Sequence, residues 1–272
     1  MRFRQSLLAA LALPALSAAA GADTMPFAAH RAVYDLSLLS ATGRKAPESV
    51  SGRIIMEFSG TACDGYVSNF RLVTDVQQAE AEPHVIDVRS TAYEDAEGKT
   101  FNFKSETKVD QITTDTVDGK ASHASDGAMV IDLTKPFAAK IDRDKGIVFP
   151  TEHMRYILNA AREGKKLLEV QAFDGSETGE KIFNTLTIIG AAIAAPADEK
   201  PAQIDALKGM RRWPVTISYF DAVKRETQAQ YIASFDLYEN GISRSLKLDY
   251  GDYALKGDMA ELTYMGDGAC KK

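Results

Sequence analysis

Two cysteines, Cys63 and Cys270, are the residues of this 272-residue chain that most clearly indicate covalent chemistry. Neither belongs to a Cys-x-x-Cys motif, the usual arrangement of a redox-active pair. Two cysteines in an exported protein are more often bonded to each other than free. We therefore predict a structural disulfide if the chain is exported. A redox-active or intermolecular pair of thiols is the alternative.

The four histidines do not form a recognisable metal site. His30, His84, His123 and His153 are scattered, without the His-x-x-x-His or His-Glu-x-x-His spacing that places two ligands on one helix face. We predict no metal and no cofactor. His153 stands just before an apolar helix face, but a histidine bonded to a backbone carbonyl or to water is the simpler interpretation.

No catalytic motif is complete. Gly98-Lys99-Thr100 resembles the end of a phosphate-binding loop, but Tyr93 replaces the upstream glycine of that loop. Asp174-Gly175-Ser176 lacks the strand-to-helix elbow of a serine nucleophile and is more typical of a turn. Two acid pairs are interpreted as solvated loop charges: Asp142 with Asp144, and Glu80 with Glu82. We predict no catalytic residue.

The N-terminus has the composition of a secretory signal peptide. Met1-Arg2-Phe3-Arg4 is basic, and the run from Ser6 to Ala20 consists almost entirely of Leu and Ala. This run is too short to span a bilayer, and an N-terminal amphipathic helix is the alternative interpretation. We predict a signal peptide over residues 1–22, cleaved after Ala20 or Ala22, and a soluble periplasmic domain without a membrane span.

The charge of the mature chain argues against nucleic acid as a partner. The full chain has 32 basic and 38 acidic residues, and cleavage would remove Arg2 and Arg4 but no acid, moving the formal net charge from −6 to −8. Binding phosphates needs clustered Lys and Arg. The densest basic pairs, Lys165-Lys166 and Arg211-Arg212, are typical of solvated faces.

Short runs of alternating apolar and polar residues predict an antiparallel all-β fold. The predicted strands lie at 32–36, 52–58, 66–73, 85–93, 100–105, 111–117, 128–133, 167–173, 181–189, 213–220, 229–238, 246–253 and 261–265. Asp118-Gly119 and Asn240-Gly241 indicate type I′ turns. Residues 194–201 could be a linker, but strands and a cysteine lie on either side, so we predict one domain over 23–272.

One helix is predicted between Thr151 and Arg162. Apolar residues recur there at helical spacing, namely Met154, Ile157, Leu158 and Ala161. Thr151 is expected to cap the first turn, and Gly164 to end the helix in the left-handed conformation. The fold class is therefore all-β with a minor helical segment.

The aromatic residues have two possible roles. Most are expected to fill the core, although a curved sheet could instead enclose a groove for an acyl chain or peptide. The set is Phe101, Phe103, Phe173, Phe183, Trp213, Tyr219, Phe220, Phe235 and Tyr253. Their spacing does not separate the two roles.

Several motifs together resemble the envelope integrity protein B family, a periplasmic family of alphaproteobacteria long described as a domain of unknown function. They are Phe149-Pro150-Thr151-Glu152-His153, the run from Ile157 to Gly164, Phe173-Asp174-Gly175-Ser176, and Tyr238-Glu239-Asn240-Gly241, with one early cysteine and one at the tail. The resemblance extends from about Ala28 to Cys270.

The resemblance implies a single periplasmic spiral of roughly fourteen antiparallel strands around a helical segment. It implies a disulfide between Cys63 and Cys270, a role in maintaining the cell envelope under stress, and no enzymatic activity. It also suggests a periplasmic tetratricopeptide-repeat protein, or another envelope-maintenance protein, as a partner.

Two functions follow as hypotheses. The first is a non-enzymatic periplasmic protein that supports envelope integrity and stress resistance through protein–protein contacts. The second is a carrier of lipid or another hydrophobic ligand in a curved β groove. A third hypothesis, a hydrolase, is the weakest, since it would need a pocket where a histidine and carboxylates converge.

Overall fold

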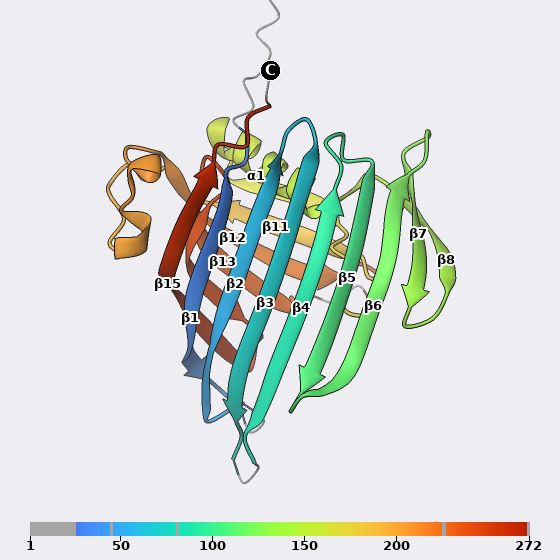
Figure 1. Ribbon diagram of the computed structural model, residues 1–272, viewed down its shortest axis with the longest axis horizontal. Helices are drawn as coiled ribbons and strands as arrows, with labels where there is room; N and C mark the ends of the chain where they lie inside the picture. Colours follow the sequence, from blue (N-terminus) through green and yellow to red (C-terminus); the bar gives the residue numbers. More distant parts are fainter. Residues whose placement is uncertain (1–25, 44–45, 80–81, 225–226, 271–272) are drawn as a thin grey trace, which may run out of the picture.

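A computed structural model describes residues 26–43, 46–79, 82–224 and 227–270. It shows one fifteen-stranded sheet that curls around a single α-helix (Figure 1). The strands are β1 (Ala29–Ala41), β2 (Ser49–Thr61), β3 (Gly65–Gln77), β4 (His84–Glu94), β5 (Thr100–Val109), β6 (Ile112–His123), β7 (Ala128–Lys135), β8 (Ala139–Lys145), β9 (Ile147–Val148), β10 (Leu167–Ala172), β11 (Phe183–Ile189), β12 (Arg212–Asp221), β13 (Tyr231–Tyr238), β14 (Ser243–Asp249) and β15 (Tyr253–Gly266). The predicted signal peptide lies outside the described residues.

The order of the strands explains the spiral shape. The sheet runs from β8 through β1 to β15 and on to β9, so the first and last strands of the chain are neighbours near its middle. The two edge strands, β8 and β9, are separated in sequence by Gly146 alone, so the sheet must curl to bring its edges together. The pairing of β9 with β10 is parallel, and the other strand pairs are antiparallel. The all-β, barrel-like fold with a minor helix is confirmed.

The helix α1 (Pro150–Arg162) fills one end of the curled sheet. Its apolar face, with Ile157 and Leu158, packs against Trp213, Val215 and Ile217 of β12. The helix is the predicted one and begins one residue earlier. Among the described residues, no helix combines the length and the apolar character needed to cross a membrane.

The start of α1 is capped by a side chain of the strand β4. Thr151 was expected to cap the helix, but it already lies within the first turn, after Pro150, and Phe149 is the N-cap residue without a side-chain bond. Instead, the Glu94 carboxylate accepts hydrogen bonds from the backbone N–H of Thr151 (2.7 Å) and of Glu152 (3.0 Å). A carboxylate at this position accepts from two backbone N–H groups that have no partner within the helix, and its negative charge interacts favourably with the positive end of the helix dipole.

The hairpin predicted at Asp118-Gly119 is wrong. Both residues lie inside β6, where a Cβ at Gly119 would be 2.7 Å from the Phe103 ring, so the glycine permits close packing. The type I′ geometry occurs instead at Asp110 (φ 50°) and Gln111 (φ 70°), between β5 and β6. Sequence alone misplaced the turn because neither residue there is glycine.

The turn between β13 and β14 is at the predicted position but is of another type. Gly241 has φ 88°, whereas Asn240 is not among the residues of positive φ. A Cβ at Gly241 would lie 2.3 Å from the Phe27 ring, so this glycine also permits the N-terminal residues to pack against the turn. The turn is therefore not type I′, which needs positive φ at both central residues.

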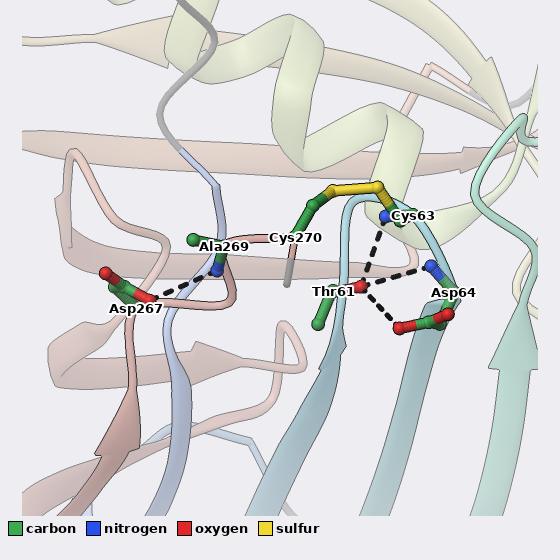
Figure 2. The surroundings of a disulfide bond; sticks show 6 residues. All are labelled: Thr61, Cys63, Asp64, Asp267, Ala269 and Cys270. Carbon is green, nitrogen blue, oxygen red and sulfur yellow. Dashed lines mark hydrogen bonds between the residues drawn. A yellow bond between two sulfur atoms is a disulfide. The ribbon is translucent and has the colours of Figure 1, made fainter. Parts of the chain in front are cut away.

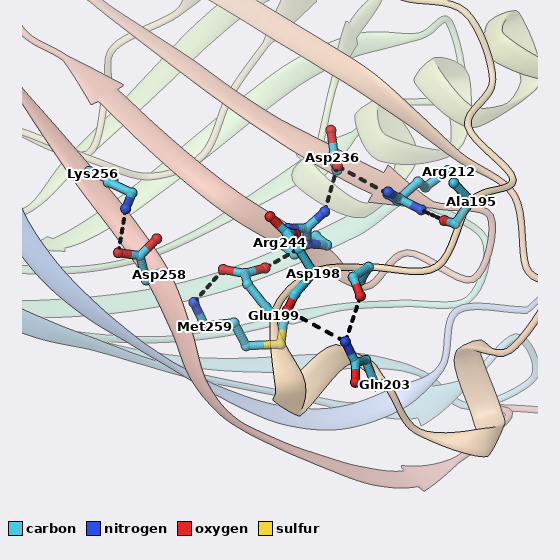
Figure 3. Close-up of polar contacts among 11 residues, drawn as sticks. Ala195, Asp198, Glu199, Gln203, Arg212, Asp236, Arg244, Lys256, Asp258 and Met259 are labelled. Carbon is cyan, nitrogen blue, oxygen red and sulfur yellow. Dashed lines mark hydrogen bonds and ion pairs between the residues drawn. The ribbon is translucent and has the colours of Figure 1, made fainter.

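Residues 194–209 cover the place where β14 and β15 separate (Figure 3). β14 pairs with β15 only from Leu246 to Asp249, which lie opposite Gly257 to Ala254. The residues of β15 after Gly257 therefore have no β14 partner on that side. Two 3₁₀ helices, η1 (Lys200–Ala202) and η2 (Asp205–Leu207), occupy this segment, and Ala202 and Leu207 join the core there. The stretch that could have been a linker therefore packs against β14, β15 and the core.

Ion pairs with two buried arginines, Arg212 and Arg244, fix this segment. Glu199 accepts hydrogen bonds from Arg244 Nε (2.5 Å) and from the backbone N–H of Met259 (2.8 Å), so it bridges β14 and β15 where they separate. Asp236 accepts from Arg244 (3.0 Å) and from Arg212 (3.1 Å). Arg212 is buried, which corrects the expectation that the Arg211-Arg212 pair is solvated.

We expect Glu94→Ala to lower the free energy of unfolding by about 2 kcal/mol, because it leaves two backbone donors at the start of α1 without an acceptor. Urea denaturation followed by circular dichroism measures the change. Glu97→Ala, in the exposed turn after β4, is the matched control and should cost less than 0.5 kcal/mol. Equal stability of the two variants would show that the cap is unimportant.

Candidate functional site

The curled sheet encloses two adjoining hollows. We call them the inner chamber, of about 180 Å³, and the outer trough, of about 590 Å³. Ser68 of β3 and Pro150 of α1 line both, so the chamber and the trough meet beside the start of the helix. Ligand pockets of proteins commonly have several hundred Å³, so the combined space suits a small molecule.

The inner chamber lies between the first turn of α1, the strands β1 to β3 and the turn after β13. Its walls are mostly apolar. The lining residues are Phe27, Ala28, His30, Met56, Phe58, Ser68, Pro150, Thr151, Met154, Asn240, Gly241 and Ser243. The capping of α1 by Glu94 fixes Pro150 and Thr151 in this wall.

His30 is the titratable residue of the chamber wall. It is 2% exposed, and its Nδ1 lies 2.8 Å from the backbone carbonyl of Ala28. Burial lowers the pKa of His30 below its usual value, so the ring is neutral at pH 7. A neutral ring facing a carbonyl through Nδ1 must carry its proton on Nδ1, which leaves Nε2 as a hydrogen-bond acceptor.

The outer trough runs along the inner face of β3 to β6. Its floor mixes apolar and hydroxyl side chains that are half-buried, among them Phe70, Val88, Ser90, Ser105 and Thr107. The loop from Asp174 to Thr178 forms the opposite wall. The strands thus leave apolar surface accessible inside the molecule.

Gly175 sets the position of that opposite wall. It has φ 70°, and a Cβ there would lie 2.5 Å from the Phe103 ring. The backbone N–H of Ser176 donates to Asp174 Oδ1 at 2.9 Å, which confirms that this motif is a turn. Burial raises the pKa of Asp174. Ser176 therefore stabilises a turn through its backbone N–H, and no histidine is among the residues that line the trough beside it.

The four histidines lie apart from one another. His153 is buried in α1, and its Nε2 lies 3.3 Å from Thr185 Oγ1, so the described partner of this nitrogen is a hydroxyl and not a backbone carbonyl. His84 contacts Asp110 at 2.7 Å, and His123 contacts the carbonyls of Gly98 and Ile147. In the part of the chain that the structure describes, no group of His, Cys, Asp and Glu could hold a metal ion.

The described members of the acid pairs are exposed, but one pair is not in a loop. Asp142 and Asp144 lie on β8, an edge strand that the sequence analysis missed. Glu82 is exposed between β3 and β4, and Glu80 lies outside the described residues. Gly98-Lys99-Thr100 connects β4 and β5 and does not precede a helix, as expected.

The aromatic residues divide between core and partly exposed positions. Five are buried: Phe101, Phe103, Phe173, Phe183 and Trp213. Four are half-buried: Tyr219, Phe220, Phe235 and Tyr253. Phe101 and Phe103 stack at 5.6 Å between ring centres and close the side of the trough.

The two cysteines join the tail to the turn after β2 (Figure 2). Their Cα atoms are 5.6 Å apart and their sulfur atoms form a disulfide. Thr61 Oγ1 accepts hydrogen bonds from the backbone N–H of Cys63 (3.2 Å) and of Asp64 (3.1 Å), which shapes the turn. The tail reaches this turn by passing close to Phe27, just before β1, and the N–H of Ala62 in the turn donates to the Gly268 carbonyl (3.4 Å).

His30, Glu94 and Asn240 were not predicted from the sequence as site residues. The signal for the first two was present, because strand alternation places His30 with Ala32 and Tyr34 on the inner face, and Glu94 with Ala92. Asn240 was noticed only as a turn residue. No local pattern could show that the turn lies against the chamber.

Comparisons with known proteins give a consistent result. A family model described as EipB-like matches residues 21–266. The "Cell envelope integrity protein EipB" of Brucella abortus (strain 2308) is 38% identical over 255 residues, which cover 93% of this chain and 90% of that protein. A crystal structure of the "Beta-barrel-like Protein of Domain of Unknown Function DUF1849 from Brucella abortus" is similar at a TM-score of 0.82 with 37% identity, covering 88% of this chain and 98% of that one.

We expect the stability of the protein to fall in mildly acidic solution because of His153. Burial lowers its pKa from 6.5 to about 4, so the unfolded chain takes up the proton first as the pH falls. The stability present above pH 6.5 is lost between pH 6.5 and 4, by up to about 3 kcal/mol. Urea denaturation at several pH values across this range gives the free energy of unfolding, which should fall less steeply with pH for His153→Gln than for the wild type. An equally steep fall for the two proteins would contradict the assignment.

We also expect Cys63→Ser and Cys270→Ser to lower the melting temperature and to increase proteolysis. A loop of this length constrains the unfolded chain by at most about 5 kcal/mol. The double variant should be no less stable than either single one, and a reducing agent should bring the wild type to the same level. Unchanged melting of the variants under oxidising conditions would show that the bond is unimportant.

Proposed function

This chain belongs to the EipB-like family, and on that premise we propose that it supports cell envelope integrity from the periplasm, as a binding protein and not as an enzyme. The name of the Brucella relative supports the envelope role. The proposed compartment is supported by the basic and apolar N-terminus and by the paired cysteines. We propose residues 1–22 as the export signal and 23–272 as one domain.

We propose that the ligand is hydrophobic or amphipathic and occupies the inner chamber and outer trough. The observation that supports this most strongly is the half-buried inner face of β3 to β5. Phe70 and Val88 line the trough there and are only partly covered by other residues. Apolar surface left accessible in a concave site is typical of ligand binding.

A binding role fits the polar groups of the site better than catalysis does. Among the residues that line the trough, the backbone N–H of Ser176 donates to Asp174, and no histidine is present to activate the Ser176 hydroxyl. His30, in the chamber, donates from Nδ1 to a backbone carbonyl, whereas a general base in a catalytic triad is oriented by a carboxylate. Contact with a tetratricopeptide-repeat protein or another envelope-maintenance protein stays a prediction from the family resemblance.

A deletion strain tests the envelope role and the binding site together. We expect the strain to be more sensitive to detergents and cell-wall antibiotics than its parent. The wild-type gene should restore resistance, whereas Ser105→Trp, which fills the trough, should not. Asn102→Trp, on the outer face of the same strand, is the matched control and should restore it.

Two results would contradict the proposal. A deletion strain as resistant as its parent would refute the envelope role. Full complementation by Ser105→Trp, with no bound molecule seen by native mass spectrometry of the wild-type protein purified from the periplasm, would refute ligand binding.

A further inference from the structure

A third hollow lies under residues 194–209, the segment that covers the place where β14 and β15 separate (Figure 3). It has about 320 Å³ and shares no lining residue with the inner chamber or the outer trough. Most of its wall comes from the segment itself and is small or apolar. The sheet contributes two polar side chains, Arg212 of β12 and Tyr238 of β13.

Arg212 has a donor group without a protein partner. Its side chain is 7% exposed, its Nε donates to Asp236 at 3.1 Å, and its Nη1 donates to the Ala195 carbonyl. No hydrogen bond of Arg212 Nη2 is found among the described residues, yet their fully buried side-chain atoms without a partner are Thr187 Oγ1 and Asn240 Nδ2 alone. Arg212 Nη2 therefore keeps accessible surface. Because Arg212 lines the hollow, this nitrogen can donate to a molecule there.

Tyr238 presents a second donor to the same hollow. Its hydroxyl has no hydrogen bond within the described part of the chain and, like Arg212 Nη2, is not one of the fully buried atoms without a partner. Burial raises the pKa of Tyr238, so the hydroxyl keeps the proton that it can donate. Arg212 and Tyr238 lie opposite each other in the pairing of β12 with β13, and the Arg212 guanidinium carbon is 5.7 Å from the centre of the Tyr238 ring. The two donors are therefore neighbours in one wall.

We infer that this hollow binds a small uncharged amide, whose carbonyl oxygen accepts from Arg212 Nη2 and from the Tyr238 hydroxyl. A carbonyl oxygen has two lone pairs and can accept from both donors at once. The apolar part of the amide would lie against the covering segment, where Ala194, Ala197 and Ile204 line the hollow. This site is separate from the chamber and the trough, so the inference goes beyond the proposed function.

The charges behind the hollow favour a neutral ligand over an anion. Asp236 accepts from both Arg212 and Arg244, and Arg244 is also bonded to Glu199 and Asp198 (Figure 3). Two arginines thus face three carboxylates, so the positive charge of Arg212 is already balanced. An anion would lose its hydration without gaining an unpaired cation, whereas a neutral carbonyl oxygen avoids this cost.

The mouth and the size of the hollow agree with this ligand class. Among the lining residues, the exposed Lys208 is matched by the exposed Asp205, so the mouth adds no net charge. The volume of about 320 Å³ is at the lower end of the usual range for ligand pockets. The hollow therefore suits a compact molecule such as 4-methylpentanamide, which combines one amide group with a short branched chain.

An NMR titration of the mature, oxidised protein with 4-methylpentanamide at pH 7.5 tests the inference. We expect saturable shifts of the backbone amide signals of Arg212 and Tyr238. The ionised 4-methylpentanoate has the same carbon skeleton and should bind about fivefold more weakly or less, because it adds a charge that the site does not neutralise. This comparison on the wild-type protein needs no variant.

Two variants then test the named site. Tyr238→Phe removes one donor and should weaken binding of the amide about fivefold, without lowering the melting temperature, because the hydroxyl has no protein partner to lose. Tyr264→Phe, on β15 outside the hollow, is its control and should bind as the wild type does. Ala194→Trp places an indole in the wall and should abolish binding, whereas Ala192→Trp, exposed but outside the wall, should not.

Several results would overturn the inference. They are shifts that do not saturate, equal or tighter binding of 4-methylpentanoate, and binding of the amide that Tyr238→Phe or Ala194→Trp leaves unchanged. Each would show that the hollow under residues 194–209 is not an amide site. The proposed function would stand in every case, because the chamber and the trough share no lining residue with this hollow.

Discussion

The pairing of β1 with β15 is the interaction on which the rest of the structure depends. It extends from Ala29 opposite Gly266 to Ala41 opposite Tyr253, nearly the whole length of β1. Without it, β1 to β8 and β9 to β15 would be two separate sheets with additional unpaired edges, which proteins normally avoid. The tail crosses the start of β1 so closely that a Cβ at Gly268 would lie 2.1 Å from the Phe27 carbonyl oxygen. The bond between Cys63 and Cys270 holds the tail in this place.

The hollow inside the spiral exists because the strands are longer than the part of the interior that the helix α1 fills. β1 to β3 each contain 13 residues, whereas α1, the one α-helix of the described residues, packs against the strands of the opposite wall and covers one end of the interior. The inner faces of β3 to β5 beyond the helix therefore stay half-buried. A barrel of many strands encloses space when its side chains do not reach across it. The proposed binding site is this unfilled part of the core.

Buried polar groups connect parts of the spiral that the backbone pairing leaves separate. Glu94 joins β4 to the start of α1, and Glu199 joins β14 to β15 through Arg244 and the Met259 N–H. Each of these groups has its hydrogen-bond partners, which is the condition for burying charge without a large penalty. Asn240 Nδ2 differs from them because it is buried without a partner beside an unfilled chamber.

The sequence by itself determined the fold class, the helix and most of the strands, because these depend on local periodicity and on chain-end signals. It also contained the motifs that placed the chain in its family. It did not determine the turn at Asp110 and Gln111, because neither residue is glycine, and it did not show the strand β8. It also did not determine the cap at Glu94, which depends on a contact with the distant Thr151. The tertiary structure alone decided that Ala28 holds His30 and Asn240 in one wall, because no local pattern relates the N-terminal strand to a turn two hundred residues later.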